Sequence, residues 1–577
     1  MTSRQARRRY AVGRLRAATR RRRPPKVAII GAGFGGLGAA VALRRAGIDD
    51  LMIIEGDDGI GGTWRRNTYL GAACDIQSHL YSFSFAPNKS WSRTYARQPE
   101  ILDYLESVAD DFDLRRHLVL GTKVRSVRWN SDTWSWDCEL DRAGEAATLT
   151  ADVVVCAVGL FGSPKLPEIE GLIDFGGTLM HTAQWDHGIE LAGKKVAVIG
   201  TGASGVQVVP ELAKTAERVT VFQRTPPWMV PKDDRPYSAA ELAQFQRNPL
   251  AVRRTRWQIW KFQHDNTATF ADDPVVAART HVATSFLERT VADGRLRRVL
   301  TPDYPFRCKR VLLGDEYYRA LQEDNVELVT DPIARIAETS VITAASREVD
   351  ADVIVLATGF ETSRYLSGID VTGIGGQRLH ERWGLDPSAY LGVAVGGFPN
   401  FFMLYGPNTN QGGNSIVYIL EAGARLVASA VSRVARRGGY VDVRPEAEKR
   451  YNDQLSADLA RTVWTHCDSY FRSPTGRIVT QWPYTELEYA RRTWRLRPRE
   501  WLHRTGTPPA RLPGLPTRST RRIGPLSGGI FGDLDGTGLS RRTKLVKVVE
   551  RLVGVCVRPF GDRAVQVVAG PGVSLQY

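Results

Sequence analysis

Two stretches of the chain share one pattern of apolar and polar positions. Residues 26–47 read KVAIIGAGFGGLGAAVALRRAG, and residues 194–213 read KKVAVIGTGASGVQVVPELA. Each begins with a short apolar run, continues through glycines, and then places small and apolar residues at helical spacing. A second apolar run follows each, at 51–55 and at 218–224. The pattern predicts a strand, a tight turn, a helix and a second strand, twice in the chain.

The glycines of the two turns fit the spacing G-x-G-x-x-G, the fingerprint of dinucleotide-binding units. They are Gly31, Gly33 and Gly36 in the first stretch and Gly200, Gly202 and Gly205 in the second. The first glycine allows the tight turn, the second lets a pyrophosphate approach the backbone, and the third lets helix and strand pack closely. The start of the helix then offers free N–H groups to the phosphates. We therefore expect two dinucleotide sites.

The residue that ends the second strand differs in charge between the two units. Glu55 follows Gly31 by 24 residues, and Arg224 follows Gly200 by the same number. A carboxylate at this position accepts hydrogen bonds from a ribose, whereas an arginine suits a 2′-phosphate. The first unit is thus predicted to bind FAD and the second NADPH. The alternative is that Arg224 is an ordinary surface arginine.

Two later apolar runs, at 152–162 and 352–360, each end in glycine and follow one of the units. This order predicts an α/β fold of two nested Rossmann-like domains. The expected boundaries are a basic disordered arm at 1–24, an FAD domain at 25–165 and 381–504, an NADPH domain at 166–380, and a basic linker and tail at 505–577. A helical insertion is expected at about 233–300 within the NADPH domain, and a basic amphipathic helix at 541–555.

The net charge of +16 lies at the two ends of the chain. Residues 1–26 carry +11 and residues 491–577 carry +12, which leaves −7 for the remainder. A nucleic-acid enzyme places its basic residues on the folded body, so nucleic acid is not an expected partner. Contact with a membrane surface is an alternative for the basic ends alone, and a loosely attached helix is the favoured interpretation there. No apolar run reaches the ~18 residues of a membrane-spanning helix.

Six cysteines are scattered without CxxC or metal-ligand spacing. This distribution indicates a reducing cytoplasm and argues against a disulfide or a metal site. Cys74 is interpreted as a packing residue.

A third motif lies between the two units. Residues 175–186 read FGGTLMHTAQWD, which fits F-x-G-x-x-x-H-x-x-x-W followed by aspartate. This motif resembles the fingerprint of the type I Baeyer–Villiger monooxygenases. The resemblance runs from about residue 26 to residue 501 and includes the segments at 61–85 and 308–318. His181 within the motif is interpreted as structural.

The resemblance implies a reaction. NADPH reduces the flavin, O2 forms a C4a-peroxyflavin, and this species inserts oxygen next to a ketone carbonyl to give an ester or lactone. It implies that Arg310 is the catalytic cation, that Asp75 orients it, and that Lys309 binds the 2′-phosphate with Arg224. Guanidinium suits the role because it does not readily release a proton. The alternatives are an ordinary ion-pair role for Arg310 and a capping role for Asp75.

The resemblance also implies further cofactor-binding positions. They are Gly62, Thr63, Trp64 and Tyr81 on the flavin side, Thr201, Ser204 and Thr225 in the second unit, Thr358 and Gly359 after the later strand, and Tyr470 near the C-terminus. The chain departs from the family at two places. Ala73 replaces an arginine, and Tyr470 replaces a tryptophan that reaches toward NADP.

The substrate and the oligomeric state are left open by the sequence. A small hydrophobic ketone or sulfide, together with O2, is expected. The functional alternatives are an N- or S-oxygenating flavin monooxygenase and an uncoupled NADPH oxidase or flavin scaffold. The identity of the product distinguishes them.

Overall fold

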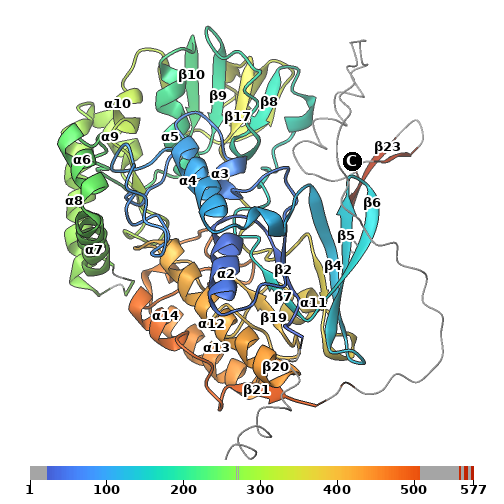
Figure 1. Ribbon diagram of the computed structural model, residues 1–577. Coiled ribbons are helices and arrows are strands. Elements are labelled where there is room, and N and C mark those ends of the chain that lie inside the picture. The colour runs from blue at the N-terminus through green and yellow to red at the C-terminus, as the bar shows by residue number, and fades with distance from the viewer. Residues whose placement is uncertain are drawn as a thin grey trace, which may run out of the picture.

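A five-stranded parallel sheet forms the centre of what we call the first unit (Figure 1). The computed structural model describes residues 23–267, 269–270, 272–506 and 508, and the backbone of three strands nearer the C-terminus. The strand order is β19 (Phe401–Met403), β7 (Val153–Cys156), β1 (Val27–Ile30), β2 (Leu51–Ile54) and β3 (Leu118–Val119). The first-unit helices are α2 (Phe34–Arg45), α4 (Gln98–Asp111) and α12 (Ile416–Arg437), and α12 packs along α2.

A second five-stranded parallel sheet forms the second unit. Its order is β13 (Val326–Val329), β10 (Arg218–Phe222), β9 (Lys195–Ile199), β17 (Val353–Leu356) and β8 (Thr178–His181). Helix α5 (Ala203–Ala213) follows β9 and packs against α10 (Tyr317–Ala320). Strands β1, β7 and β17 are buried at every residue, as expected of strands covered on both faces. The predicted α/β class with parallel sheets is confirmed.

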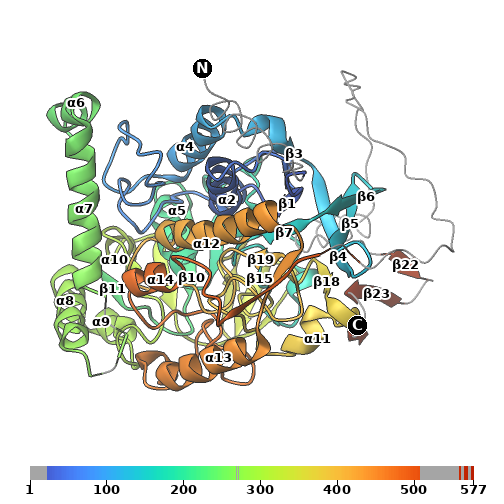
Figure 2. The same ribbon diagram turned by 60° about the horizontal axis from the view of Figure 1, so that its bottom comes forward.

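Four helices stand beside the second unit. They are α6 (Ala239–Arg247), α7 (Pro249–Asp265), α8 (Pro274–Thr290) and α9 (Gly294–Leu300). Figure 2 shows α6, α7 and α8 along one side of the molecule. Helix α6 starts with a capping box between Ser238 and Glu241, and α7, α8 and α9 start with Asn248, Asp273 and Asp293 as side-chain caps. The helices lie within the range predicted for a helical insertion.

Smaller sheets and helices complete the described chain. The hairpins β4 (Thr122–Asn130), β5 (Ser135–Arg142) and β6 (Glu145–Ala151) pair with β18 (Asp370–Thr372). The other sheets are β14 (Ile333–Ile336), β15 (Ser340–Thr343) and β16 (Glu348–Asp350); β11 (Met229–Val230) and β12 (Leu312–Leu313); and β20 (Tyr440–Val443) and β21 (Trp501–Arg504). The short or peripheral helices are α3 (Thr63–Arg66), α11 (Leu379–Trp383), α13 (Pro445–Leu459) and α14 (Glu486–Arg492). The strands β22 (Arg558–Phe560), β23 (Ala564–Ala569) and β24 (Val573–Gln576) form an antiparallel sheet.

The chain crosses between the two units twice, and the two crossings lie side by side. The amide of Lys165 donates to the carbonyl of Gly359 at 2.8 Å, and the amide of Glu361 donates to the carbonyl of Ser163 at 3.0 Å. After the second crossing, β18 pairs with β4. After residue 361 the chain thus pairs again with a strand of the first half of the sequence. The expected domain boundaries stay predictions.

Two of the expectations concern residues that lie outside the described part of the chain. The basic arm lies outside it up to residue 22, and the helix expected at 541–555 lies outside it altogether. Among the described residues, no helix combines the length and the apolar character needed to cross a membrane.

Candidate active site

The two glycine turns have the same spatial arrangement. A Cβ atom on Gly31 would lie 2.6 Å from the carbonyl oxygen of Ala157, and one on Gly200 would lie 2.6 Å from that of Ala357. Both residues have positive φ, of 104° and 110°. The third glycines, Gly36 and Gly205, are closer still to the backbone. The first and third glycines are therefore required by the fold itself.

The second glycine of each turn has no such close contact. A Cβ atom on Gly202 would meet no protein atom within 4 Å, and one on Gly33 would be in ordinary contact with Gly62 at 3.6 Å. The fold alone does not require glycine at these positions. A pyrophosphate approaching the start of α2 or α5 does require it, because a side chain would occupy the space it needs.

The charged strand ends differ in their surroundings. Glu55 is buried, and its carboxylate accepts from the amides of Ala32 at 2.7 Å and Asp57 at 3.0 Å. Arg224 is exposed. Incomplete solvation lowers the pKa of Lys309, and the nearby Arg224 cation lowers it further. Two cations brought together in this way attract an anion.

The residues predicted for the flavin side lie in and around helix α3. Gly62 precedes this helix with a φ of 55°, and Thr63 begins it. The indole nitrogen of Trp64 donates to the hydroxyl of Tyr81 at 3.0 Å, and the Tyr81 ring packs edge-on against Phe34 at the start of α2. The loop is thereby fixed beside the first glycine turn.

The remaining predicted positions of the second unit lie where strands β9, β10 and β17 end. The hydroxyl of Thr201 donates to the carbonyl of Thr225 at 3.2 Å, which links the glycine turn to the end of β10. Ser204 lies in the first turn of α5. Thr358 donates to the carbonyl of Lys165 at 2.6 Å, and Gly359 has a φ of 84°. The last two therefore belong to the paired crossings.

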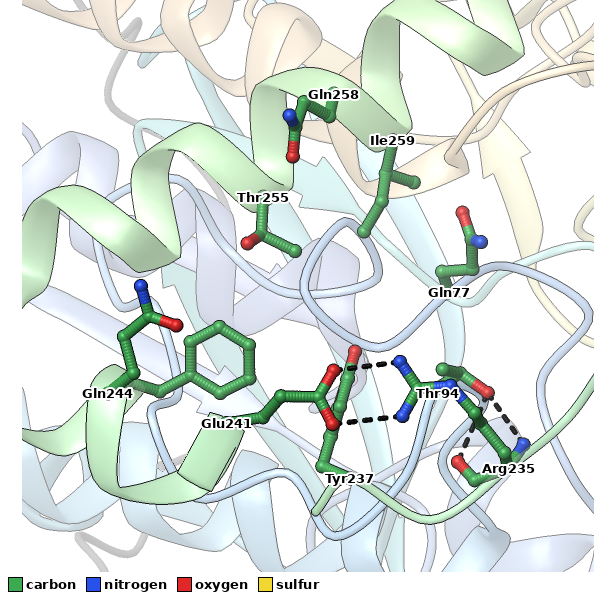
Figure 3. A pocket seen from close by; sticks show the side chains of 10 residues that line it. Gln77, Thr94, Arg235, Tyr237, Glu241, Gln244, Thr255, Gln258 and Ile259 are labelled. Carbon is green, nitrogen blue, oxygen red and sulfur yellow. Dashed lines mark hydrogen bonds and ion pairs between the residues drawn. The ribbon is translucent and has the colours of Figure 1, made fainter. Parts of the chain in front are cut away.

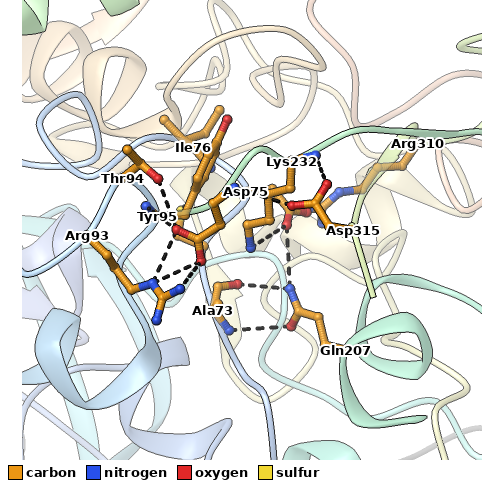
Figure 4. A network of polar contacts seen from close by, with 12 residues as sticks. Ala73, Asp75, Ile76, Arg93, Thr94, Tyr95, Gln207, Lys232, Arg310 and Asp315 are labelled. Carbon is orange, nitrogen blue, oxygen red and sulfur yellow. Dashed lines mark hydrogen bonds and ion pairs between the residues drawn. The ribbon is translucent and has the colours of Figure 1, made fainter. Parts of the chain in front are cut away.

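Arg310 and Asp75 form an ion pair across 235 residues of sequence, with Nη2 and Oδ2 2.6 Å apart (Figure 4). The Asp75 side chain is 11% exposed and that of Arg310 is 42% exposed, so the guanidinium is accessible while its partner is not. Poor solvation alone lowers the pKa of Arg310, but the Asp75 carboxylate, together with Tyr470 and Tyr405, outweighs this effect and raises it. Arg310 therefore stays charged at any physiological pH.

Tyr470 lies beside this ion pair. Incomplete solvation of the hydroxyl raises the pKa of Tyr470, and the nearby Arg310 cation lowers it in part. Thr362, just after the second crossing, donates to the backbone carbonyl of Tyr470 at 2.7 Å. The structure thus brings Tyr470 together with both Arg310 and the crossing.

Two residues of this network were missed by the sequence analysis. The Nζ atom of Lys232 is 4.0 Å from Oδ1 of Asp75, its side chain is 9% exposed, and the ammonium lies over the ring of Tyr95. Gln207 on α5 hydrogen-bonds two residues of the first unit. The hydroxyl of Tyr69 donates to its side-chain oxygen at 2.7 Å. Its side-chain nitrogen donates to the carbonyl of Ala73 at 3.1 Å (Figure 4). No local motif marks either residue, because each acts through contacts distant in sequence.

His181 and Cys74 have no features of reactive groups. His181 is fully buried at the end of β8, and its Nδ1 accepts the amide of Ala183 at 3.0 Å. Burial lowers its pKa to about 4, so it is neutral near pH 7. Burial raises the pKa of Cys74 to about 12, which keeps the thiol protonated. Both observations agree with structural roles.

The expectation that the chain has no disulfide is wrong. Cys308 and Cys467 are joined, with their Cα atoms 6.0 Å apart. The bond was not visible in the cysteine spacing because its partners are 159 residues apart and meet only through the fold. The described residues contain no group of three or more histidine, cysteine or acidic side chains that could hold a metal ion, and no metal site was predicted.

A cavity of about 300 Å³ lies between the loop segments around Gln77 and Thr94 and the helices α6 and α7 (Figure 3). Its charged residues, Arg235 and Glu241, form a bidentate pair at 2.7 and 2.9 Å. Neither Arg310 nor Asp75 lines it. This cavity is thus distinct from the Arg310 site.

Comparison with known proteins gives consistent results. A family model described as pyridine nucleotide-disulphide oxidoreductase matches residues 28–304. A Baeyer–Villiger monooxygenase of Streptomyces coelicolor is 41% identical over 476 residues, covering 82% of this chain and 91% of that protein. One from Pseudomonas aeruginosa is 39% identical over 477 residues, covering 82% and 89%. The chain belongs to the Baeyer–Villiger monooxygenases.

Solved structures of this family share the fold. The closed crystal structure of cyclohexanone monooxygenase has a TM-score of 0.74 at 29% identity and covers 84% of this chain and 99% of that one. Oxidized steroid monooxygenase bound to NADP has a TM-score of 0.72 at 31% identity and covers 82% and 97%. A Baeyer–Villiger monooxygenase of this kind uses FAD, NADPH and O2. The predicted enzyme class and cofactors are confirmed, and the alternative functions receive no support.

Both dinucleotides fit the residues present. A Cβ atom on Gly33 would make only ordinary contacts, and this glycine lies beside the buried carboxylate of Glu55, which suits the ADP part of FAD. The open space at Gly202 accompanies the paired cations Arg224 and Lys309, which suit the 2′-phosphate of NADPH.

Proposed function

We propose that Arg310, held by Asp75, is the catalytic cation for oxygen insertion next to the carbonyl of a small hydrophobic ketone. Small sulfides are proposed as second substrates of the same site. The observation that carries the proposal is the ion pair of an accessible guanidinium with a shielded carboxylate, at 2.6 Å. We also propose that the enzyme works in the cytoplasm, where it draws on NADPH.

Arg310 has the properties that the reaction demands. Bound FAD, once reduced by NADPH, supplies the oxygen-activating chemistry. Attack on the ketone places negative charge on the former carbonyl oxygen, and a fixed cation stabilises that charge where water is scarce. Guanidinium donates hydrogen bonds without giving up its proton, so it stabilises the anion without neutralising it. Asp75 restrains the guanidinium, because an unpaired cation in a poorly solvated site is costly.

The proposed cofactor contacts follow the geometry of the turns. Gly31, Gly33, Gly36 and Glu55 would hold the ADP part of FAD, with Gly62, Thr63, Trp64 and Tyr81 on its flavin side. Gly200, Thr201, Gly202, Ser204, Gly205, Arg224, Thr225 and Lys309 would hold NADPH. Thr358, Gly359 and Tyr470 would contact the cofactors at the crossings.

The proposal is tested with purified enzyme, NADPH and a panel of cyclic ketones and aryl sulfides. The solved cyclohexanone and steroid monooxygenases suggest the first ketones to try. Ester, sulfoxide, NADPH consumed and hydrogen peroxide released are measured together. The wild-type enzyme is expected to form one ester per NADPH consumed with its preferred ketone.

Arg310→Ala is expected to keep FAD bound but to lower the rate of ester formation by about 10²–10³, the effect typical of losing one group that stabilises an oxyanion. Arg310→Lys should recover part of the rate. Arg347→Ala is the matched control, because Arg347 pairs with Glu327 on the surface of the second unit. A normal ester rate in Arg310→Ala would refute the assignment.

A further inference from the structure

We propose that the disulfide between Cys308 and Cys467 positions the cations that hold the 2′-phosphate of NADPH, and that its reduction weakens NADPH binding. Cys308 and Cys467 would be positioning residues whose effect depends on the redox state. This inference rests on the proposed role of Lys309 and Arg224. It adds a control of cofactor affinity that the proposed function does not contain.

The disulfide joins the two segments that supply the site. Cys308 directly precedes Lys309 and Arg310, and Cys467 lies three residues before Tyr470. The same segments also meet through polar groups. The Arg310 cation lowers the pKa of Tyr470, and the Asp468 carboxylate favours the charged form of Lys309. The covalent bond therefore lies at the centre of the charged site rather than at a distance from it.

Both segments are loops. Residues 301–311 and 466–485 contain no helix or strand, and isolated β-bridges and side-chain contacts hold them in place. The first is fastened by Arg307, which donates to the carbonyls of Asn266 and Gly412 at 3.0 Å each. The second is fastened at Tyr470 through Thr362. A cross-link between two loop segments limits how far they can separate, and here it does so next to Lys309.

Reduction of the disulfide would affect Lys309 most directly, because Lys309 follows Cys308 in the chain. It already lies near a like charge, Arg224, and its pKa is lowered. Two cations held close together repel each other and separate when a constraint is removed. Separation spreads the positive charge that faces a 2′-phosphate. NADH lacks this phosphate, so its binding should not depend on the disulfide.

The cysteine pair can be oxidised and reduced by simple reagents. Two thiols and one hydrogen peroxide give the disulfide and two waters: one thiolate attacks the peroxide to form a sulfenic acid, and the second thiol displaces water from it. A small dithiol reverses the change by exchange and is itself oxidised to a disulfide. Cys308 is fully buried and Cys467 is partly exposed. A reducing thiol would therefore attack the sulfur of Cys467. Disulfides inside cells are usually transient and redox-sensing, which fits this behaviour.

The test uses the full-length enzyme with FAD bound. Alkylation of denatured protein with and without prior reduction by dithiothreitol, followed by mass spectrometry, should show two additional thiols after reduction, at Cys308 and Cys467. Anaerobic rapid mixing then gives the Kd of NADPH and the limiting rate of flavin reduction. On reduction of the disulfide we expect the Kd of NADPH to rise about tenfold, as for one misplaced charged contact. The limiting rate and the Kd of NADH should change little.

Variants separate positioning from general stability. Cys467→Ala should match the reduced wild type and no longer respond to dithiothreitol. Cys138→Ala, which alters a buried free thiol in β5, should keep the wild-type response. An unchanged Kd of NADPH on reduction, or equal weakening of NADPH and NADH, would overturn the proposal. Flavin reduction needs no ketone, so this result and the Arg310 result are independent of each other.

Discussion

At the scale of single residues, the charge at the end of the second strand separates the two units chemically. Glu55 is buried and bound by two backbone amides, whereas Arg224 is exposed with Lys309 nearby. A buried carboxylate in the same place would repel a phosphate. We propose that this one position, in an otherwise repeated structure, selects the dinucleotide that each unit binds.

Arg224→Ala should weaken the binding of NADPH by about 1.5–3 kcal/mol, the value for a lost charged hydrogen bond, and leave that of NADH nearly unchanged. The Kd of each nucleotide, from titration of flavin reduction, measures the difference. Arg218→Ala, an exposed residue at the start of the same strand, serves as the control. Equal losses for NADPH and NADH would show that Arg224 does not contact the 2′-phosphate.

At the scale of elements, the strand–turn–helix units show how far local sequence determines structure. The turns and the strand-end charges were predictable, because the residues that form them are neighbours along the chain. Asp75 and Arg310 carry no such signal, and only the resemblance of their segments to a family suggested them. Lys232, Gln207 and the Cys308–Cys467 bond escaped prediction, since their partners are 132 to 159 residues away. Long-range contacts depend on the whole fold.

Gly202→Ala and Gly205→Ala should have opposite effects. A Cβ atom on Gly202 meets open space and its φ is −78°, so the variant should keep the melting temperature but bind NADPH weakly. A Cβ atom on Gly205 would lie 2.3 Å from the carbonyl oxygen of Gly200, so that variant should lose stability by roughly 1–3 kcal/mol. Thermal unfolding and NADPH titration of both variants check this. Normal NADPH binding by Gly202→Ala would contradict the proposed pyrophosphate position.

At the scale of the whole molecule, catalysis requires the second unit to present nicotinamide to the flavin of the first. Gln207 is one of the direct links between them, because it extends from α5 to Tyr69, Ala73 and Asp75. The same loop carries the partner of Arg310. The relative placement of the units is therefore coupled to the orientation of Arg310, the proposed catalytic cation.

Gln207→Leu keeps a similar side-chain volume but removes these hydrogen bonds. We expect about a tenfold loss in the limiting rate of flavin reduction, equivalent to one or two hydrogen bonds, with little change in the Kd of NADPH. Anaerobic rapid mixing measures both quantities. Gln246→Leu, which alters an exposed hydrogen bond between α6 and Ser90, is the control. A lower affinity with an unchanged rate would assign Gln207 to the nucleotide site instead.

The paired crossings have a consequence for how such a chain is assembled from parts. Because residues 163–165 and 359–361 are hydrogen-bonded to each other, the second unit enters and leaves the first at one place. A segment whose two ends meet can be added to or exchanged within a host domain with little disturbance of the host's core. The two junctions mark where a recombinant enzyme would join the nucleotide unit of one relative to the flavin unit of another. The bonds of Gln207, the Arg310–Asp75 pair and the Cys308–Cys467 bridge are among the contacts that such a chimera would have to preserve.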